Sequence, residues 1–221
     1  MHSRAVFDAL KAWRFARNDV DEARWVLLDV ESSGLDVRHD RLLAIAAIAV
    51  HFDAERPRIH PGDSFEVVLR QRDGSLTPDK SNILLHGIGV GAQHAGVNPA
   101  QALAAFKAFA GKAPLVAFHA SFDRAMIERA ARGALGRSLP NPWLDLAPLA
   151  SVLYPDLRAR ALDEWLAHFN IHCAVRHQAA ADTLATAELL LMLWPALQRQ
   201  LPRPSFASVA HLAAQRRWLP R

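Results

Sequence analysis

Apolar residues along the chain fall into two patterns, short unbroken runs and longer helical stripes. Short apolar runs bounded by turn residues are typical of buried strands. Strands are therefore predicted at residues 25–30, 42–52, 64–69, 115–118 and 143–146. Turn-forming residues separate the first three runs, so these strands are expected to form an antiparallel meander.

Helical periodicity dominates the second half of the chain. Asn98 and Pro99 are typical of a helix start, because Asn caps the first turn and Pro fits it, and Gly111 is typical of a helix end. Helices are predicted at residues 98–110, 122–135, 162–169 and 179–194, the last ending before Pro195. A meander followed by alternating strands and helices predicts an α/β fold in which helices pack on a mixed sheet.

The length of 221 residues and the 51% hydrophobic content predict one domain with a full core. Residues 4–17 have the apolar spacing of an amphipathic helix ahead of that domain. The C-terminal stretch contains prolines and ends in a basic segment. We therefore expect an N-terminal helical extension at residues 1–21, a compact domain at 22–197 and a C-terminal tail at 198–221.

Charge and cysteine content narrow the class of protein. A net charge of +4 permits a polyanionic partner such as nucleic acid without demanding one. The single cysteine, Cys173, excludes an internal disulfide framework and a multi-thiolate zinc cluster. The longest apolar run, residues 42–50, is far shorter than the ~18 residues of a spanning helix. With no signal-peptide pattern at the start, we expect a soluble, cytoplasmic protein without a membrane partner.

Acidic residues stand at the ends or starts of three predicted elements. Asp29 and Glu31 close the first strand, where residues two apart face the same side. Asp123 stands where a later strand gives way to a helix, and Asp182 follows His177 in the first turns of the last helix. Taken singly, each acid has an ordinary explanation as a solvated strand end, a helix cap or a partner of the helix dipole.

Taken together, these residues predict a metal-dependent active site, because α/β sheets place active sites at strand ends. Crowded carboxylates repel each other, and a hard cation such as Mg²⁺ or Mn²⁺ relieves the repulsion. Carboxylates in one cleft can hold two such ions ~3.5–4 Å apart, the spacing used for attack on phosphodiesters. A histidine, with an ordinary pKa of ~6.5, can take the proton from the attacking water.

Three segments resemble, in order and spacing, the motifs of the DnaQ-like (DEDDh) 3′–5′ exonuclease family of the RNase H-like superfamily. These segments are residues 28–35 (LDVESSGL), 118–123 (FHASFD) and 177–182 (HQAAAD). Residues 85–88 (LHGI) and 141–153 also resemble elements of that family, and the resemblance covers roughly residues 24–195. The chain is similar to exonuclease domains of the DNA polymerase III epsilon type.

This resemblance implies an RNase H-like fold and a metal-dependent exonuclease that releases nucleoside 5′-monophosphates from the 3′ end of single-stranded nucleic acid, with DNA favoured. It implies the histidine subgroup with His177 as general base, because the only tyrosine, Tyr154, lies far from the third motif. Two Mg²⁺ or Mn²⁺ ions are implied at Asp29, Glu31, Asp123 and Asp182. Substrate contacts are implied at Ser32, Ser33, Gly34, Leu35, His86 and Phe122.

Other functions stay open at this point. The same motifs suit an RNA-trimming exoribonuclease or an oligoribonuclease-like enzyme. A different class is a non-catalytic nucleic-acid-binding or polymerase-associated protein that kept the fold. Since the chain shows no polymerase domain, a proofreading role would need a polymerase or other protein partner, for which the tail at residues 198–221 is a candidate docking segment.

Overall fold

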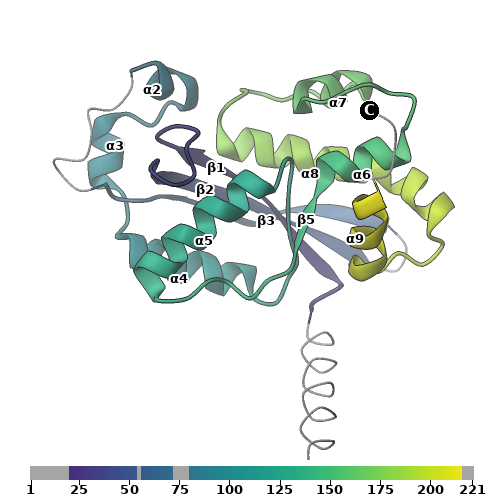
Figure 1. Ribbon diagram of the computed structural model, residues 1–221, viewed down its shortest axis with the longest axis horizontal. Coiled ribbons are helices and arrows are strands. Elements are labelled where there is room, and N and C mark those ends of the chain that lie inside the picture. The colour runs from purple at the N-terminus through teal and green to yellow at the C-terminus, as the bar shows by residue number, and fades with distance from the viewer. Residues whose placement is uncertain (1–19, 54–55, 72–79, 216–221) are drawn as a thin grey trace, which may run out of the picture.

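A five-stranded mixed sheet forms the centre of the molecule (Figure 1). The structure is a computed structural model and describes residues 20–53, 56–71 and 80–215. The strand order is β3-β2-β1-β4-β5; the first three strands are antiparallel, and β4 and β5 run parallel to β1. The strands are β1 Arg24–Ser32, β2 Leu42–Asp53, β3 Arg56–Val68, β4 Leu115–Ala117 and β5 Trp143–Asp145.

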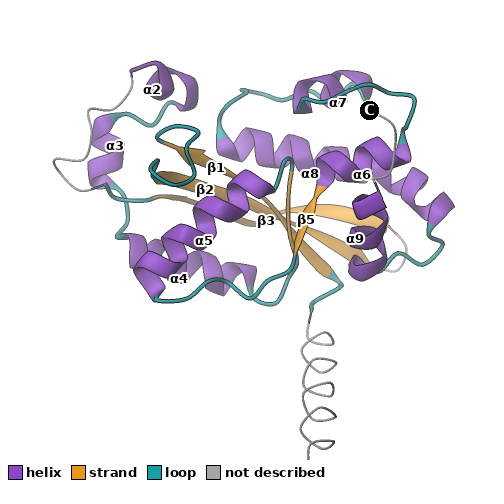
Figure 2. Ribbon diagram, in the orientation of Figure 1, coloured by secondary structure: helices purple, strands orange, loops and turns teal. Residues whose placement is uncertain are grey.

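Helices cover both faces of this sheet (Figure 2). Those described are α2 Lys80–His86, α3 Val90–Ala95, α4 Pro99–Ala110, α5 Ser121–Leu135, α6 Leu146–Leu153, α7 Leu162–His168, α8 Ala179–Gln200 and α9 Phe206–Ala214. The predicted α/β class, with an antiparallel meander followed by parallel strands, is confirmed. The sequence pattern did not reveal α2, α3, α6 or α9.

Alternation along β1 divides the core into two layers. Trp25 and Leu27 pack with the buried residues of α6, α8 and α9. Val26, Leu28 and Val30 pack with those of α4 and α5 on the opposite face. Because successive strand residues point to opposite faces, the odd-numbered positions of β1 are directed toward α8. This assignment decides where the acids of β1 lie.

The last long helix extends further than predicted. We expected it to end before Pro195, but α8 continues through Pro195 to Gln200. A proline inside a helix costs roughly 3 kcal/mol, because it lacks an N–H and crowds the preceding turn. Burial of Trp194 and Leu197 on either side of Pro195 offsets this cost, since each large apolar side chain contributes roughly 1.5–3 kcal/mol.

The predicted C-terminal tail contains a short helix that packs on the core. Helix α9 buries Phe206, Val209 and Leu212 against α6, and the backbone N–H of Phe206 donates to Glu22 at 2.6 Å. Residues 206–214 of the expected tail at 198–221 thus pack on the compact domain. The predicted N-terminal helix at residues 4–17 lies outside the described residues, as do residues 216–221.

Helix α8 is long and apolar enough to cross a membrane by length and composition, the one such helix among the described residues. Within the fold it packs on β1 and β2, and 61% of its apolar window is buried inside the protein. Core helices of globular domains pass the same test, so this feature is weak evidence for a membrane span.

Candidate active site

Strand β1 brings Asp29 and Glu31 to one face of the sheet, near its C-terminal end. Both occupy odd-numbered positions, on the face that α8 covers. Their partners across the antiparallel ladder are Ala46 and Ala44. These small side chains leave space above the sheet for the two carboxylates. The strand continues to Ser32, so the acids lie within its last residues and not directly at its end.

Asp123 reaches the same region from the opposite face because β4 is shorter than β1. Strand β4 pairs with Val26 and Leu27 only. On this side of β1, the backbone N–H of Val30 therefore has no neighbouring strand, although Val30 pairs with β2 on the other side. The carboxylate of Asp123, at the start of α5, accepts this N–H. The second motif is thereby tied to the first by a direct hydrogen bond.

Sequence reasoning missed Asp145, which fixes the turn before α5. Its Oδ1 accepts the backbone N–H of His119 at 3.0 Å and that of Ala147 at 3.1 Å. His119 has a φ of 60°, and this left-handed conformation needs such support. The available signal was an Asp directly before an apolar helical stretch, a pattern typical of a helix cap. Asp145 thus positions the helix that carries Asp123.

The third motif is held by contacts within its own loop. Asp182, at 6% exposure, lies in the first turn of α8. Its Oδ2 accepts the backbone N–H of His177 at 3.0 Å, and its Oδ1 accepts Nη1 of Arg176. Arg176 also donates from Nε to Asp163 of α7. His177 has a φ of 62°, and its ring is exposed to solvent.

Electrostatics show that these acids share one environment. Burial raises the pKa of Asp29 well above its ordinary value; Asp123 and Glu31 raise it further, and Arg176 opposes them. Burial raises the pKa of Glu31 to about 7; the N–H of Ala179 opposes this and Asp123 adds to it. Burial also raises the pKa of Asp123 to about 7, which its backbone hydrogen bonds oppose. Each carboxylate therefore resists ionisation unless a cation is nearby.

The donor set fits a hard divalent cation. The Oε1 atom of Glu31 is buried without a hydrogen-bond partner among the described residues, and carboxylate oxygens are the ligands that Mg²⁺ and Mn²⁺ prefer. No three His, Cys, Asp or Glu side chains of the described ranges converge on one metal position. The guanidinium of Arg176 occupies Oδ1 of Asp182.

The predicted substrate residues of the first motif form a tight loop after β1. Ser32 donates from Oγ to Gly34 O at 2.6 Å, and Ser33 donates from Oγ to Asp40 Oδ1 at 2.8 Å. A Cβ at Gly34 would meet the Asp40 carboxylate at 2.4 Å, so a larger residue here would displace that side chain. Leu35 is 86% exposed at the tip of the loop, where an apolar side chain is available to a ligand.

The other two predicted substrate residues differ in exposure. His86, at the end of α2, is 5% exposed, and its Nδ1 accepts the N–H of Ile88 at 3.0 Å. Burial lowers the pKa of His86, which favours the neutral ring. Asn82 of the same helix donates to Ser32 O at 2.8 Å and so ties α2 to the first-motif loop. Phe122 is half-buried against the apolar layer under α5.

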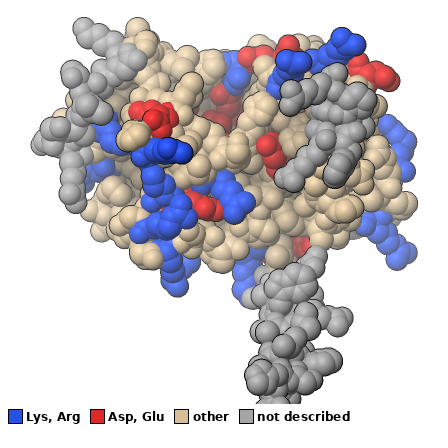
Figure 3. Space-filling view, viewed as in Figure 1, with Lys and Arg blue, Asp and Glu red and all other residues tan. Residues whose placement is uncertain are grey.

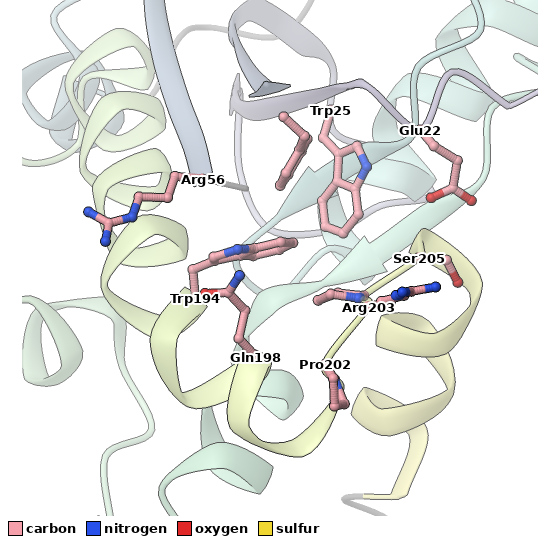
Figure 4. A pocket seen from close by; sticks show the side chains of 10 residues that line it. Glu22, Trp25, Arg56, Trp194, Gln198, Pro202, Arg203 and Ser205 are labelled. Carbon is pink, nitrogen blue, oxygen red and sulfur yellow. The ribbon is translucent and has the colours of Figure 1, made fainter. Parts of the chain in front are cut away.

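A groove of about 920 Å³ lies at the opposite end of β1 from the acids (Figure 4). Trp25, Trp194 and Phe52 form its aromatic wall, and Arg56 and Arg203 stand at its edges. It contains none of the residues predicted for the active site.

The fold and the cluster of acids define an RNase H-like nuclease domain, and comparison with known proteins agrees. Residues 26–190 match the family model RNase_T, described as an exonuclease. The chain belongs to this exonuclease family. The predicted DnaQ-like family and the predicted class of enzyme, an exonuclease, are thereby confirmed.

Similar proteins carry names that refer to DNA polymerase III. The chain is 32% identical over 191 residues to a "DNA polymerase III subunit epsilon-like protein" of Rhodobacter capsulatus, covering 83% of this chain and 25% of that protein. It is 28% identical over 177 residues to "DNA polymerase III PolC-type" of Clostridium perfringens, covering 80% of this chain and 12% of that protein. The chain thus spans a quarter or less of these relatives.

Solved structures confirm the fold. The crystal structure of E. coli exonuclease I in complex with a dT13 oligonucleotide superposes with a TM-score of 0.69 at 19% identity, over 81% of this chain and 43% of that one. The roles of the individual site residues stay predictions. The structure nevertheless groups Asp29, Glu31, Asp123 and Asp182 around the end of β1, with the backbone of His177 bonded to Asp182.

Proposed function

We propose that this chain is a metal-dependent 3′–5′ exonuclease that hydrolyses single-stranded DNA to nucleoside 5′-monophosphates. Asp29, Glu31, Asp123 and Asp182 would hold two Mg²⁺ or Mn²⁺ ions, and His177 is the general base. Bound divalent ions would supply Lewis acidity, which makes water a stronger acid and stabilises charge on the leaving oxygen. Proton transfer and alignment of the substrate would be carried out by residues of this chain.

The observation that carries the proposal is the interaction of the half-buried Asp29 and Glu31 of β1 with the buried Asp123 of α5. The buried Asp182 of α8 is linked to them through Arg176. Burial and neighbouring carboxylates raise the pKa values of Asp29, Glu31 and Asp123, and Glu31 keeps a buried oxygen without a partner among the described residues. A fold retains such a cluster at a cost in stability, which is expected where the charges have a task. Hydrolysis of phosphodiesters with divalent cations is a task that suits this donor set.

His177 suits the role of base by its position. Its backbone N–H is bonded to Asp182, so the residue stays next to the acids while its ring remains exposed. In the proposed reaction an unprotonated ring nitrogen accepts the proton of the attacking water. The 3′ oxygen of the penultimate nucleotide leaves when the bond to phosphorus breaks. The exposed Leu35 and the loop around it would contact the terminal nucleotide and align its phosphate.

DNA is favoured over RNA because the named relatives belong to DNA polymerase III. The test uses an oligonucleotide labelled at its 5′ end, in DNA and RNA forms, with Mg²⁺ or with chelator. A 3′–5′ exonuclease gives a ladder of shortened labelled products only with metal. An endonuclease gives internal cuts without a ladder, and a 5′–3′ enzyme releases the label first. Either of these results would refute the proposal, and faster shortening of RNA would refute the choice of DNA.

Two variants control this assay. Asp123→Asn removes one predicted ligand and should abolish the ladder. Asp156→Asn removes an exposed carboxylate outside the cluster and should leave activity unchanged. If both variants keep wild-type activity, the buried acids are not the active site. If wild type binds the oligonucleotide without cutting it under any metal, a binding protein that kept the fold becomes the better explanation.

A further inference from the structure

A groove of about 620 Å³ lies at the end of the sheet where β1 ends. Its walls come from the start of β2, the residues after β3, the start of α4 and the second half of α5. Arg41, Arg70 and Arg129 line it from three different elements of the fold. None of the described residues that line it is acidic. The described lining of the groove therefore carries three guanidinium groups and no carboxylate.

Neutral acceptors hold two of these guanidinium groups. Arg70 donates from Nε to the carbonyl oxygen of Gly96 at 2.9 Å, and Arg41 Nη1 lies 3.5 Å from Gln71 Oε1. The amide of Gln71 is fixed in turn, since its Nε2 donates to two backbone carbonyl oxygens at 3.1 and 2.9 Å. The contact with the carbonyl oxygen of Gly96 orients the guanidinium of Arg70 without cancelling its charge.

The arginines of α5 differ in how their charge is balanced. Arg124 and Arg132 contact Glu128 at 2.7 and 3.3 Å on the outer surface of the helix. Arg129 faces the groove instead. Within the described part of the chain, neither Arg70 nor Arg129 forms an ion pair. Arg70 and Arg129 thus have no carboxylate partner among the described residues, whereas Arg124 and Arg132 share one carboxylate, that of Glu128.

The groove adjoins the acid cluster. The backbone N–H of Ser33, in the first-motif loop, donates to Arg41 O at 2.9 Å. Helix α5 carries Asp123 near its start and Arg129 six residues later, which is ~9 Å along the helix axis. Figure 3 shows acidic side chains in a recess of this face, with Lys and Arg side chains on both sides of it. At ~3.4 Å per nucleotide of a stacked strand, ~9 Å corresponds to two to three nucleotides.

We propose that this arginine groove binds the phosphates of the nucleic-acid strand two to three nucleotides before the 3′ end. Guanidinium groups suit this task, because their donors match phosphate oxygens in pairs and remain charged at any working pH. The acids would then act on the terminal phosphodiester while the groove holds the part of the strand on its 5′ side. The identity of the ligand rests on the proposed function, whereas the positive groove itself does not.

The test compares long and short substrates. For Arg70→Gln/Arg129→Gln, the KM for a long oligothymidylate should rise roughly tenfold more than the KM for the p-nitrophenyl ester of thymidine 5′-monophosphate, which is too short to reach the groove. The slope of log affinity against log salt should fall by about 1.4, from ~0.7 per lost phosphate contact on a single strand. The matched control is Lys107→Gln/Arg137→Gln, which removes two charges from another groove beside α4 and α5.

Binding of a fluorescent oligothymidylate in EDTA, measured by anisotropy, separates this proposal from the exonuclease assignment. If wild type cuts neither substrate but the groove variant alone loses affinity, the exonuclease assignment fails and the groove stands. If groove and control variants lose affinity equally, or the groove variant loses none, the proposal is overturned. Inorganic phosphate that competes as well as the oligonucleotide would also overturn it. Arg129→Gln alone, which breaks no backbone contact, serves if the double variant melts early.

Discussion

Replacement of Glu31 by Gln is expected to stabilise the metal-free protein at neutral pH while it abolishes nuclease activity. Burial raises the pKa of Glu31 to about 7, and Asp123 adds to the effect. Glutamine has the same shape and can still accept the backbone N–H of Ala179. It removes the negative charge, which without a cation has no favourable partner at Glu31 Oε1. The change therefore removes a cost of folding and a predicted metal ligand at once.

The magnitude follows from the shift in the pKa of Glu31. A rise from 4.5 to about 7 is worth roughly 3 kcal/mol at ~1.4 kcal/mol per unit. Because solvent reaches part of this side chain, we reduce the value to about 1–2 kcal/mol. The pKa is raised on folding, so stability is lost as pH rises from about 4.5 to about 7 and stays lost above. The benefit of Glu31→Gln should thus be absent below about pH 4.5 and complete above about pH 7.

Thermal unfolding in EDTA measures this difference across that pH range. For a domain of this size, about 1–2 kcal/mol corresponds to a rise in Tm of roughly 2–8 °C. Glu66→Gln, an exposed change on β3, is the control and should leave Tm unchanged at each pH. A Tm for Glu31→Gln below that of wild type at about pH 8 would refute the argument from charge. Glu31 would then be a structural residue whose negative charge supports the fold.

Three further predictions concern the cation and the base. Mg²⁺ or Mn²⁺, but not Na⁺ at equal ionic strength, should raise the Tm of wild type and not that of Asp123→Asn/Asp182→Asn, because the cation binds only the folded site; equal stabilisation of both proteins would count against these ligands. Arg176→Gln should lower Tm in chelator and tighten Mn²⁺ binding measured by calorimetry, whereas the exposed Arg158→Gln should change neither; unaltered Mn²⁺ affinity would show that Arg176 does not compete with the cation. His177→Ala should slow turnover by roughly 10²–10⁴-fold and flatten the rise of rate with pH while Mn²⁺ binding persists; a near wild-type rate at saturating Mg²⁺ would remove His177 as the base.

Much of the fold was predictable because its central elements carry strong local patterns. The apolar run at residues 42–52 forms β2 as expected, and the stripe that begins at Leu162 forms α7. At the C-terminus, long-range packing determines that residues 206–214 form a helix on the domain and not a separate tail. Helix α9 has only nine residues, and its apolar face packs against α6. This packing partner could not be predicted from the sequence of α9 itself. Short helices of this kind gain most of their stability from tertiary contacts, which a linear pattern does not contain.

The acids of the site were predictable for a similar reason. Asp29 and Glu31 stand out because they interrupt an apolar strand, and Asp123 and Asp182 because they open helices. Asp145 and Arg176 were missed because the role of each depends on a contact that only the folded chain makes. Asp145 contacts His119, and Arg176 contacts Asp182 across the loop before α8. Asp145 acts on His119 from β5, and nothing in its own segment indicates that contact.

Arg176 also accounts for how the third motif tolerates a buried acid without a cation. Asp182 is buried next to a cluster whose other carboxylates have raised pKa values, so its charge requires compensation. The guanidinium of Arg176 provides it at Oδ1, and the same cation opposes the raised pKa of Asp29. The N–H of His177 binds the other oxygen, Oδ2. A divalent cation that displaces Arg176 from Oδ1 would leave this second contact in place. We therefore expect the guanidinium to exchange with the cation while His177 stays beside the acids, so that one loop both stabilises the metal-free site and positions the base.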